Sequence, residues 1–141
     1  MSAHASFRVA VEAGDHAGMA AAFAPDAVLR SPVSFKPFEG REAISRLLAI
    51  LLETFEDFRY TDEFEAEGKA ALVFSARVGD RELQGLDLFR FGADGQIAEL
   101  TVMVRPLSAV IALAEAVGPK LAAACSATSG WSVISPTGSV S

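Results

Sequence analysis

The stretch "LQGLDLFRFGADGQIAEL", Leu83 to Leu100, decides the fold because it contains two strand-like runs joined by a short turn. Its centre, "GADG", has the residues that tight turns between antiparallel strands use. The first run places Asp87 between Leu86 and Leu88, in a strand that is otherwise built for a core. Because side chains alternate along a strand, Asp87 is expected to share a face with Leu83, Gly85, Phe89 and Phe91.

The neighbouring segments extend this hairpin into a larger sheet. "FRYTDEFEA" and "AALVFSARV" are strand-like and precede it, and Gly79–Asp80 predicts a hairpin turn after the second of them. We therefore expect consecutive antiparallel strands from about residue 58 to residue 105. Neither face of the strand around Asp87 is cleanly polar, which favours a pocket on one side of the sheet and a partner on the other.

The N-terminal part predicts helices before the sheet. Residues 3–13 and a second helix from His16 to about Phe23, capped by Asp15, are followed by a short strand in "AVLRSPV" that Pro32 limits. "SFKPFEG" is expected to be a loop. The clearest helix runs from Arg41 to Phe55 and carries one wide apolar stripe.

The C-terminal part predicts a last helix that begins at Pro106 and ends at Gly118 and Pro119. Its buried side is expected to contain Leu107, Val110, Ile111 and Ala114. Residues 126–141 form a Ser/Thr/Gly-rich tail with Trp131 as its anchor, and residues 1–125 form one domain. The order of elements indicates an α+β fold, with the helices on one face of a curved sheet.

Composition excludes several classes of protein. The chain has 141 residues, a net charge of -6 and a pI near 4.8, which argue against nucleic acid and an anionic membrane surface as partners. No segment reaches the roughly 18 apolar residues of a membrane span, and the N-terminus lacks a secretory pattern. Cys125 is the single cysteine, so no internal disulfide is possible, and it lacks an activating context. We expect a cytoplasmic protein.

The runs "EAGD", "GMAAAFAPDAVLRSPV", "FEGREAISRLL" and "GLDLFRFGADGQIAEL" together resemble the SnoaL-like branch of the NTF2-like superfamily, over roughly residues 3–105. The resemblance implies a cone: a strongly bent antiparallel sheet wrapped around a long helix, with a pocket in its mouth. It also implies a homodimer through the outer face of the sheet. Members include ketosteroid isomerases, polyketide cyclases, dehydratases and non-catalytic binding modules, so the fold alone does not choose the function.

The resemblance to ketosteroid isomerase implies that Asp87 matches the buried, protonated aspartic acid of that enzyme, a case the field uses to illustrate an acid kept neutral by an apolar site. It places Leu100, Val102 and Val104 in the pocket wall. The general base of that enzyme falls at Ser31, its oxyanion-hole tyrosine at Phe7 and a supporting tyrosine at Leu48. A serine without an adjacent histidine does not abstract a carbon-bound proton at neutral pH, so this isomerase mechanism is not expected.

Several of these residues have two interpretations. Asp87 is either a pocket acid whose pKa is raised by desolvation or a carboxylate paired with an arginine or a backbone amide. Ser31 is a pocket contact or a turn residue, and Tyr60 is a pocket hydroxyl or a half-buried strand residue. Phe23, Phe55 and Phe89 belong to the core, the cavity wall or both. His4 is expected in a frayed helix end and His16 in solvent.

The sequence therefore predicts a pocket for a small apolar ligand with one carbonyl or hydroxyl group, which Asp87 would contact. No metal ligands at metal-binding spacing and no phosphate loop are evident, so no metal or cofactor is expected. Such a pocket fits a cofactor-independent acid–base enzyme, isomerase-like, cyclase-like or hydrolase-like, that acts on a ring or polyketide-like compound. The alternative is a non-catalytic dimeric module that binds a ligand or another protein.

Overall fold

The strands predicted after residue 55 form most of a six-stranded sheet in the computed structural model, which describes residues 2–124. β3 (Glu56–Ala66), β4 (Lys69–Val78), β5 (Arg81–Phe91) and β6 (Ile97–Arg105) are consecutive antiparallel neighbours, as predicted. Gly79 and Gly95 lie in the two predicted turns with φ of 62° and 84°, a backbone conformation that glycine adopts without a steric penalty.

The other two strands correct the sequence prediction. β1 (Phe23–Ser31) begins four residues before the predicted strand, and the predicted loop at 34–40 is largely β2 (Ser34–Glu39), paired antiparallel to β1. The order is β2-β1-β6-β5-β4-β3, and β1 runs parallel to β6, so the sheet is not wholly antiparallel. The parallel partner of β1, β6, is remote in sequence, and the local spacing of apolar residues carries no signal for such a pairing.

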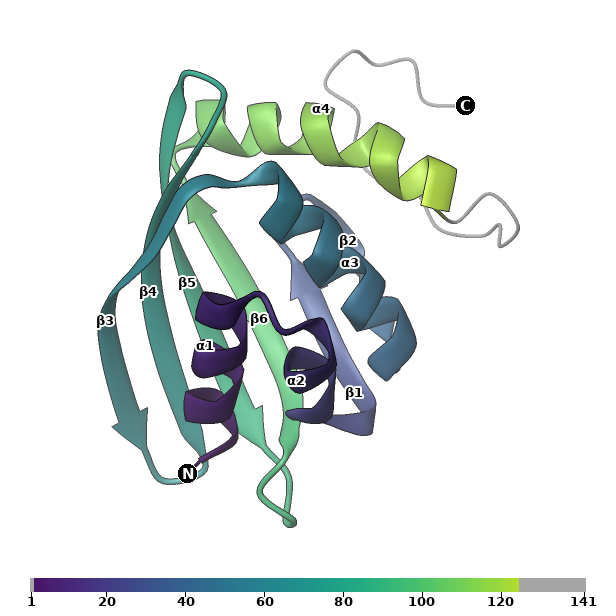
Figure 1. Cartoon of the computed structure of the whole chain (residues 1–141), viewed down its shortest axis with the longest axis vertical. Coiled ribbons are helices and arrows are strands. Elements are labelled where there is room, and N and C mark those ends of the chain that lie inside the picture. Colours follow the sequence, from purple (N-terminus) through teal and green to yellow (C-terminus); the bar gives the residue numbers. More distant parts are fainter. Residues whose placement is uncertain (1, 125–141) are drawn as a thin grey trace.

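Three helices lie on one side of the sheet (Figure 1). α1 (Ala3–Ala13) and α3 (Arg41–Thr54) match the predicted helices, whereas α2 (His16–Ala21) ends before Phe23 because that residue starts β1. Asp15 caps α2 as predicted, since its Oδ1 accepts a hydrogen bond from the Gly18 amide at 3.0 Å. Ile44, Leu47, Leu48 and Leu51 form the buried stripe of α3.

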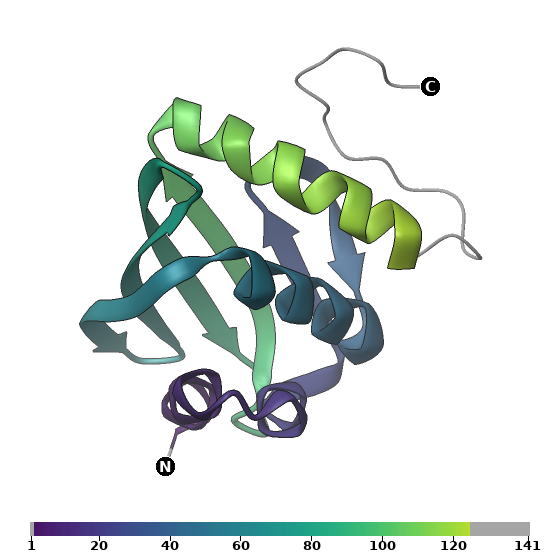
Figure 2. The ribbon, with the colours of Figure 1, turned by 45° about the horizontal axis from the view of Figure 1, so that its top comes forward.

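α4 (Leu107–Ala124) crosses one end of the sheet and contacts α3, β4, β5 and β6 (Figure 2). The predicted break at Gly118 and Pro119 is wrong, because the helix continues through both residues. The predicted buried side is also wrong in part: Ala114 is buried, but Leu107 and Ile111 are exposed. The side chains that α4 buries are Ala109, Leu113, Ala114, Val117 and Leu121.

The core lies between the helices and the concave side of the sheet. Phe7 of α1 contacts Phe23 of β1 edge-to-face at 5.6 Å between ring centroids, and Phe89 of β5 at 5.5 Å. These contacts hold α1 against the concave side of the sheet. The helices and the six-stranded sheet together confirm the predicted α+β architecture. Cys125, Trp131 and the predicted tail lie outside the described residues.

Candidate functional site

Asp87 lies in the middle of β5 and points to the concave side of the sheet. It is directly opposite Val102 of β6 and Leu72 of β4, both buried. The alternation predicted from the sequence holds, since Leu83, Gly85 and Phe89 are buried on the same face. The side chain of Asp87 is therefore enclosed, and the residue is only 7% exposed.

A narrow crevice of about 30 Å³ reaches the Asp87 carboxyl, and we call it the inner crevice. Apart from Asp87 and Tyr60, every side chain in its wall is apolar. The wall consists of Phe7, Val11, Leu48, Leu51, Leu52, Phe55, Phe58, Tyr60, Phe74, Asp87 and Val102. An acid in the wall of an apolar crevice is desolvated, and acids whose pKa is perturbed inside a cleft are frequent at functional sites.

The surroundings of Asp87 favour its neutral form. Among residues 2–124, no side chain or amide forms a hydrogen bond or ion pair with its carboxyl. Burial alone raises the pKa of Asp87 from 3.8 to about 7, because the charged form loses its hydration and gains no compensating contact. The protonated carboxyl can donate one hydrogen bond and accept others, so it suits a carbonyl or hydroxyl oxygen.

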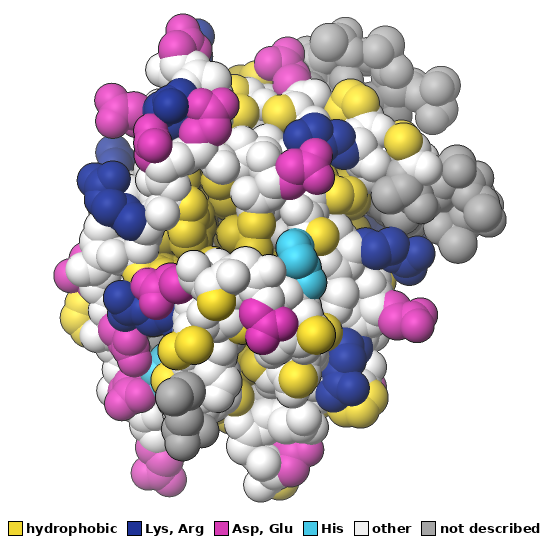
Figure 3. All heavy atoms as spheres, in the orientation of Figure 1, with side chains coloured by type: hydrophobic (Ala, Val, Ile, Leu, Met, Phe, Trp, Pro, Cys, Tyr) yellow, Lys and Arg dark blue, Asp and Glu magenta, His cyan; other side chains and the backbone are white. Residues whose placement is uncertain are grey.

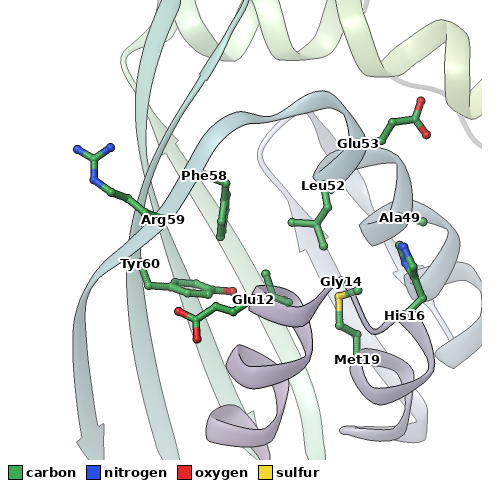
Figure 4. A pocket seen from close by; sticks show the side chains of 11 residues that line it. Glu12, Gly14, His16, Met19, Ala49, Leu52, Glu53, Phe58, Arg59 and Tyr60 are labelled. Carbon is green, nitrogen blue, oxygen red and sulfur yellow. The ribbon is translucent and has the colours of Figure 1, made fainter.

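A wider cavity of about 630 Å³, the outer chamber, lies between α1, α2, α3 and β3 (Figure 4). Figure 3 shows this face hollowed, with hydrophobic side chains in the hollow. Its wall consists of Val11, Glu12, Gly14, His16, Met19, Ala49, Leu52, Glu53, Phe58, Arg59 and Tyr60. Four residues, Val11, Leu52, Phe58 and Tyr60, line both cavities, so the two spaces meet there.

Tyr60 stands at this junction. Its ring contacts Phe58 edge-to-face at 5.0 Å, and the guanidinium carbon of Arg8 lies 5.3 Å from the ring centroid. In Figure 4 the side chain extends from β3 toward α1, whereas Arg59 points away from the chamber. Burial and then the charge of Asp87 raise the pKa of Tyr60, so its hydroxyl stays protonated. Tyr60 is thus both a half-buried strand residue and a pocket residue.

The structure brings together only some of the predicted site residues. Phe7, Leu48, Phe55, Tyr60 and Val102 line the inner crevice with Asp87. Phe23, Phe89 and Leu100 are fully buried in the core and line neither cavity. Val104 lines a separate hollow of about 320 Å³ with Leu86 and Met103.

Ser31 lies at the end of β1, and its hydroxyl accepts a hydrogen bond from the Val33 amide at 3.1 Å. This contact is that of a turn residue, and Ser31 does not line the inner crevice. The prediction omitted Val11, Leu51, Leu52 and Phe58 from the wall. Val11 was recoverable, because it follows Phe7 by one helical turn on a helix that was predicted correctly.

A second polar cluster joins α1 to β3, where the sequence predicts a frayed end. His4 is 1% exposed, so that prediction is wrong. Its Nε2 lies 2.9 Å from a carboxylate oxygen of Glu63 and 2.9 Å from one of Glu65, and its Nδ1 lies 3.0 Å from the Ser2 hydroxyl. Burial opposes ionisation of Glu63, but hydrogen bonds from His4 and Arg8 outweigh it and lower the pKa of that carboxyl.

Comparisons with known proteins show the family of the chain. Residues 3–100 match the family model described as a SnoaL-like domain. The chain is 31% identical over 114 residues to a steroid Δ-isomerase of Nocardioides simplex, with 78% of this chain and 93% of that protein covered.

The chain is also similar in fold to solved structures. A steroid Δ-isomerase from Pseudomonas aeruginosa is 40% identical, with a TM-score of 0.82 and coverage of 88% of this chain and 92% of that one. A protein with a cystatin-like fold from Silicibacter pomeroyi is 28% identical, with a TM-score of 0.80 and coverage of 84% of both chains. Within residues 2–124, none of the helices has the length and apolar character needed to cross a membrane.

Proposed function

Because this chain belongs to the SnoaL-like domain family, we propose that it binds an apolar compound through one oxygen atom, with Asp87 as the hydrogen-bond donor. The observation that supports this proposal is the Asp87 carboxyl, which lies in the wall of an apolar crevice and forms no hydrogen bond or ion pair within residues 2–124. A protonated carboxyl in such a site donates to a carbonyl oxygen and stabilises negative charge that develops on it.

The size of the two cavities suggests how a ligand would lie. The inner crevice of about 30 Å³ has room for roughly one water molecule or a single oxygen-bearing group. The outer chamber of about 630 Å³ is within the range of small-molecule sites. A ring compound would therefore place its carbonyl at Asp87 and the rest of its skeleton in the outer chamber.

The reaction that follows from this arrangement is acid–base chemistry beside a carbonyl. Hydrogen bonding from Asp87 polarises the carbonyl and acidifies the adjacent C–H bond, which is the first half of an isomerisation or a cyclisation. The two relatives named steroid Δ-isomerase make an enolisable ring ketone the first substrate class to test. No cofactor is needed for such a step.

A non-catalytic binding module is the second candidate, and one observation favours it. Proton abstraction requires a base, and Ser31, at the position where the resemblance places one, uses its hydroxyl for the Val33 amide. The carboxylates in the outer chamber are also engaged, Glu12 with Arg8 and Glu53 with Lys120. The pocket would then bind a ligand without converting it chemically.

Binding is tested with 2-acetylnaphthalene carrying an isotope label at its carbonyl carbon. At about pH 5.5, below the pKa of Asp87, NMR should show a downfield shift of the bound carbonyl that fades at about pH 8.5. Asp87→Leu should remove the shift and weaken binding about tenfold, whereas Asp80→Asn, on an exposed turn, should change neither. An unchanged spectrum in Asp87→Leu would show that Asp87 is not the donor.

Turnover is tested in heavy water with the same ketone. Abstraction of a methyl proton and return of a deuteron from solvent would replace hydrogen next to the carbonyl, and mass spectrometry would detect it. Exchange that is faster than in buffer and absent from Asp87→Leu would support the enzyme. Binding without exchange would support the module.

We further propose that the outer face of the sheet pairs with a second copy of the chain. Leu86 and Met103 lie opposite each other on that face, and Met103 is 48% exposed. Burying such a surface between two copies would remove it from water. Light scattering should give a dimer mass for the wild type and a monomer mass for Met103→Lys. A wild-type monomer would reject the proposal.

A further inference from the structure

The cluster of His4, Glu63 and Glu65 gathers two carboxylate oxygens beside one ring nitrogen atom. Two carboxylate oxygens, one from each glutamate, lie 2.9 Å from the same His4 Nε2. A neutral imidazole has one N–H, and when that hydrogen is on Nδ1 the Nε2 lone pair faces both carboxylates. Either a hydrogen on Nε2 shared between the two carboxylates or a metal ion between these atoms satisfies the arrangement.

The three ligand atoms are already gathered. One atom from each residue lies within 4.8 Å of the others, on side chains that come from α1 and from alternate positions of β3. A tetrahedral zinc ion with ligands at roughly 2.0–2.2 Å separates them by about 3.3–3.6 Å. The observed separations of 2.9 Å from Nε2 therefore need to open by about 0.4–0.7 Å.

The contacts around the three residues are those that metal ligands use. The Ser2 hydroxyl lies 3.0 Å from His4 Nδ1 and holds the ring so that Nε2 points at the glutamates. Arg8 donates to Glu63 Oε1 at 2.9 Å and leaves Oε2 directed at His4. Outer contacts of this kind orient a ligating histidine and a ligating carboxylate. Glu65 is more than half exposed, which gives an ion a path from solvent.

We propose that His4, Glu63 and Glu65 form a binding site for one divalent transition-metal ion, with zinc as the best match and solvent in the fourth position. One nitrogen and two carboxylate oxygens are ligands that zinc accepts. The charges are compatible as well, because the two carboxylates and the Arg8 guanidinium leave a net charge of -1 beside a neutral imidazole. Bound metal would fasten the start of α1 to β3, as Figure 1 places them, and α1 carries Phe7 and Val11 of the inner crevice.

The test uses Zn²⁺ and Co²⁺ added to the whole chain at about pH 8, where protons compete less for imidazole. Calorimetry should show one Zn²⁺ per chain, and Co²⁺ should give the visible absorption of a tetrahedral site. A hundredfold excess of Zn²⁺ over its dissociation constant should raise the Tm by about 5–10 °C.

Variants separate this site from incidental binding. Glu65→Gln changes an exposed side chain and should weaken Zn²⁺ binding at least about tenfold without unfolding the protein. His4→Gln should abolish it, and His16→Gln, at the other histidine, should leave it unchanged. Absence of the cobalt spectrum, or zinc binding that is equal in wild type and Glu65→Gln, would overturn the proposal and leave the cluster as an ion-paired clamp.

Discussion

The ring of Phe74 on β4 lies directly over the backbone of Gly85 on β5. A Cβ atom placed on Gly85 would be 2.0 Å from Cζ of Phe74 and 2.5 Å from both Cε atoms, closer than atoms can approach. Phe74 is also part of the wall of the inner crevice, and Gly85 is two residues from Asp87. Glycine is therefore required at this position for the wall beside Asp87 to keep its shape.

Replacing Gly85 with alanine should displace the Phe74 ring and lower the free energy of unfolding by about 1–3 kcal/mol, the usual cost of overpacking. Urea denaturation measures the change. Gly118→Ala is the matched control, because no atom lies within 4 Å of its added Cβ and alanine is favoured in a helix. Equal stability of the two variants would show that the Phe74 ring moves aside at no cost.

The position of Asp87 could be predicted from sequence because it follows from local rules. Alternation along one strand placed Asp87 on the same face as Leu83, Gly85 and Phe89, and the family resemblance indicated that this face is the pocket side. The parallel pairing of β1 with β6 could not be predicted in this way, since Phe23 meets Ile97 far along the chain. The burial of His4 could not be predicted for the same reason, because its partner Glu63 is 59 positions away along the chain.

The buried face of α4 shows a different limit. Nearly every residue of this helix is apolar, so the spacing of apolar residues fits more than one face and does not select between them. The structure selects the face of Leu113, Val117 and Leu121 because that side meets α3 and the sheet.

The orientation of α4 on the sheet predicts different outcomes for Leu113 and Leu107. Leu113→Ala should lower the free energy of unfolding by about 2–5 kcal/mol, because it leaves a cavity beneath the helix. Leu107, which is 74% exposed, should tolerate alanine within about 0.5 kcal/mol. Thermal and urea unfolding of both variants would check this, and a larger loss for Leu107→Ala would mean that α4 is turned differently on the sheet.

Arg41 connects the start of α3 to the start of β1. Its Nε and Nη2 donate to the Phe23 carbonyl at 3.1 and 2.5 Å. Arg41→Met keeps much of the aliphatic stem but removes both donors, so the free energy of unfolding should fall by about 1–3 kcal/mol. Arg46→Met is the control, since Arg46 has no hydrogen bond of this kind among residues 2–124. Equal effects would show that solvent replaces the Arg41 contact fully.

The raised pKa of Asp87 predicts how the free energy of unfolding depends on pH. Its pKa is raised from 3.8 to about 7 in the folded state, so the folded protein holds this proton at pH values where the unfolded chain has lost it. The contribution of protonated Asp87 to the stability of the folded state is complete below about pH 4. It is lost as the pH rises through about 7, because ionising a buried carboxyl without a partner is unfavourable. The full change is on the order of 4 kcal/mol.

Asp87→Asn removes this titration while keeping the shape of the side chain. The difference in unfolding free energy between wild type and Asp87→Asn should therefore shift in favour of the variant as the pH rises from about 4 to about 8. Taking this difference cancels the opposite contribution of carboxylates such as Glu63, whose pKa is lowered. Urea denaturation across this range measures it. A difference that stays constant with pH would mean that Asp87 titrates near its ordinary value, and the proposed hydrogen-bond donor would then be ionised at neutral pH.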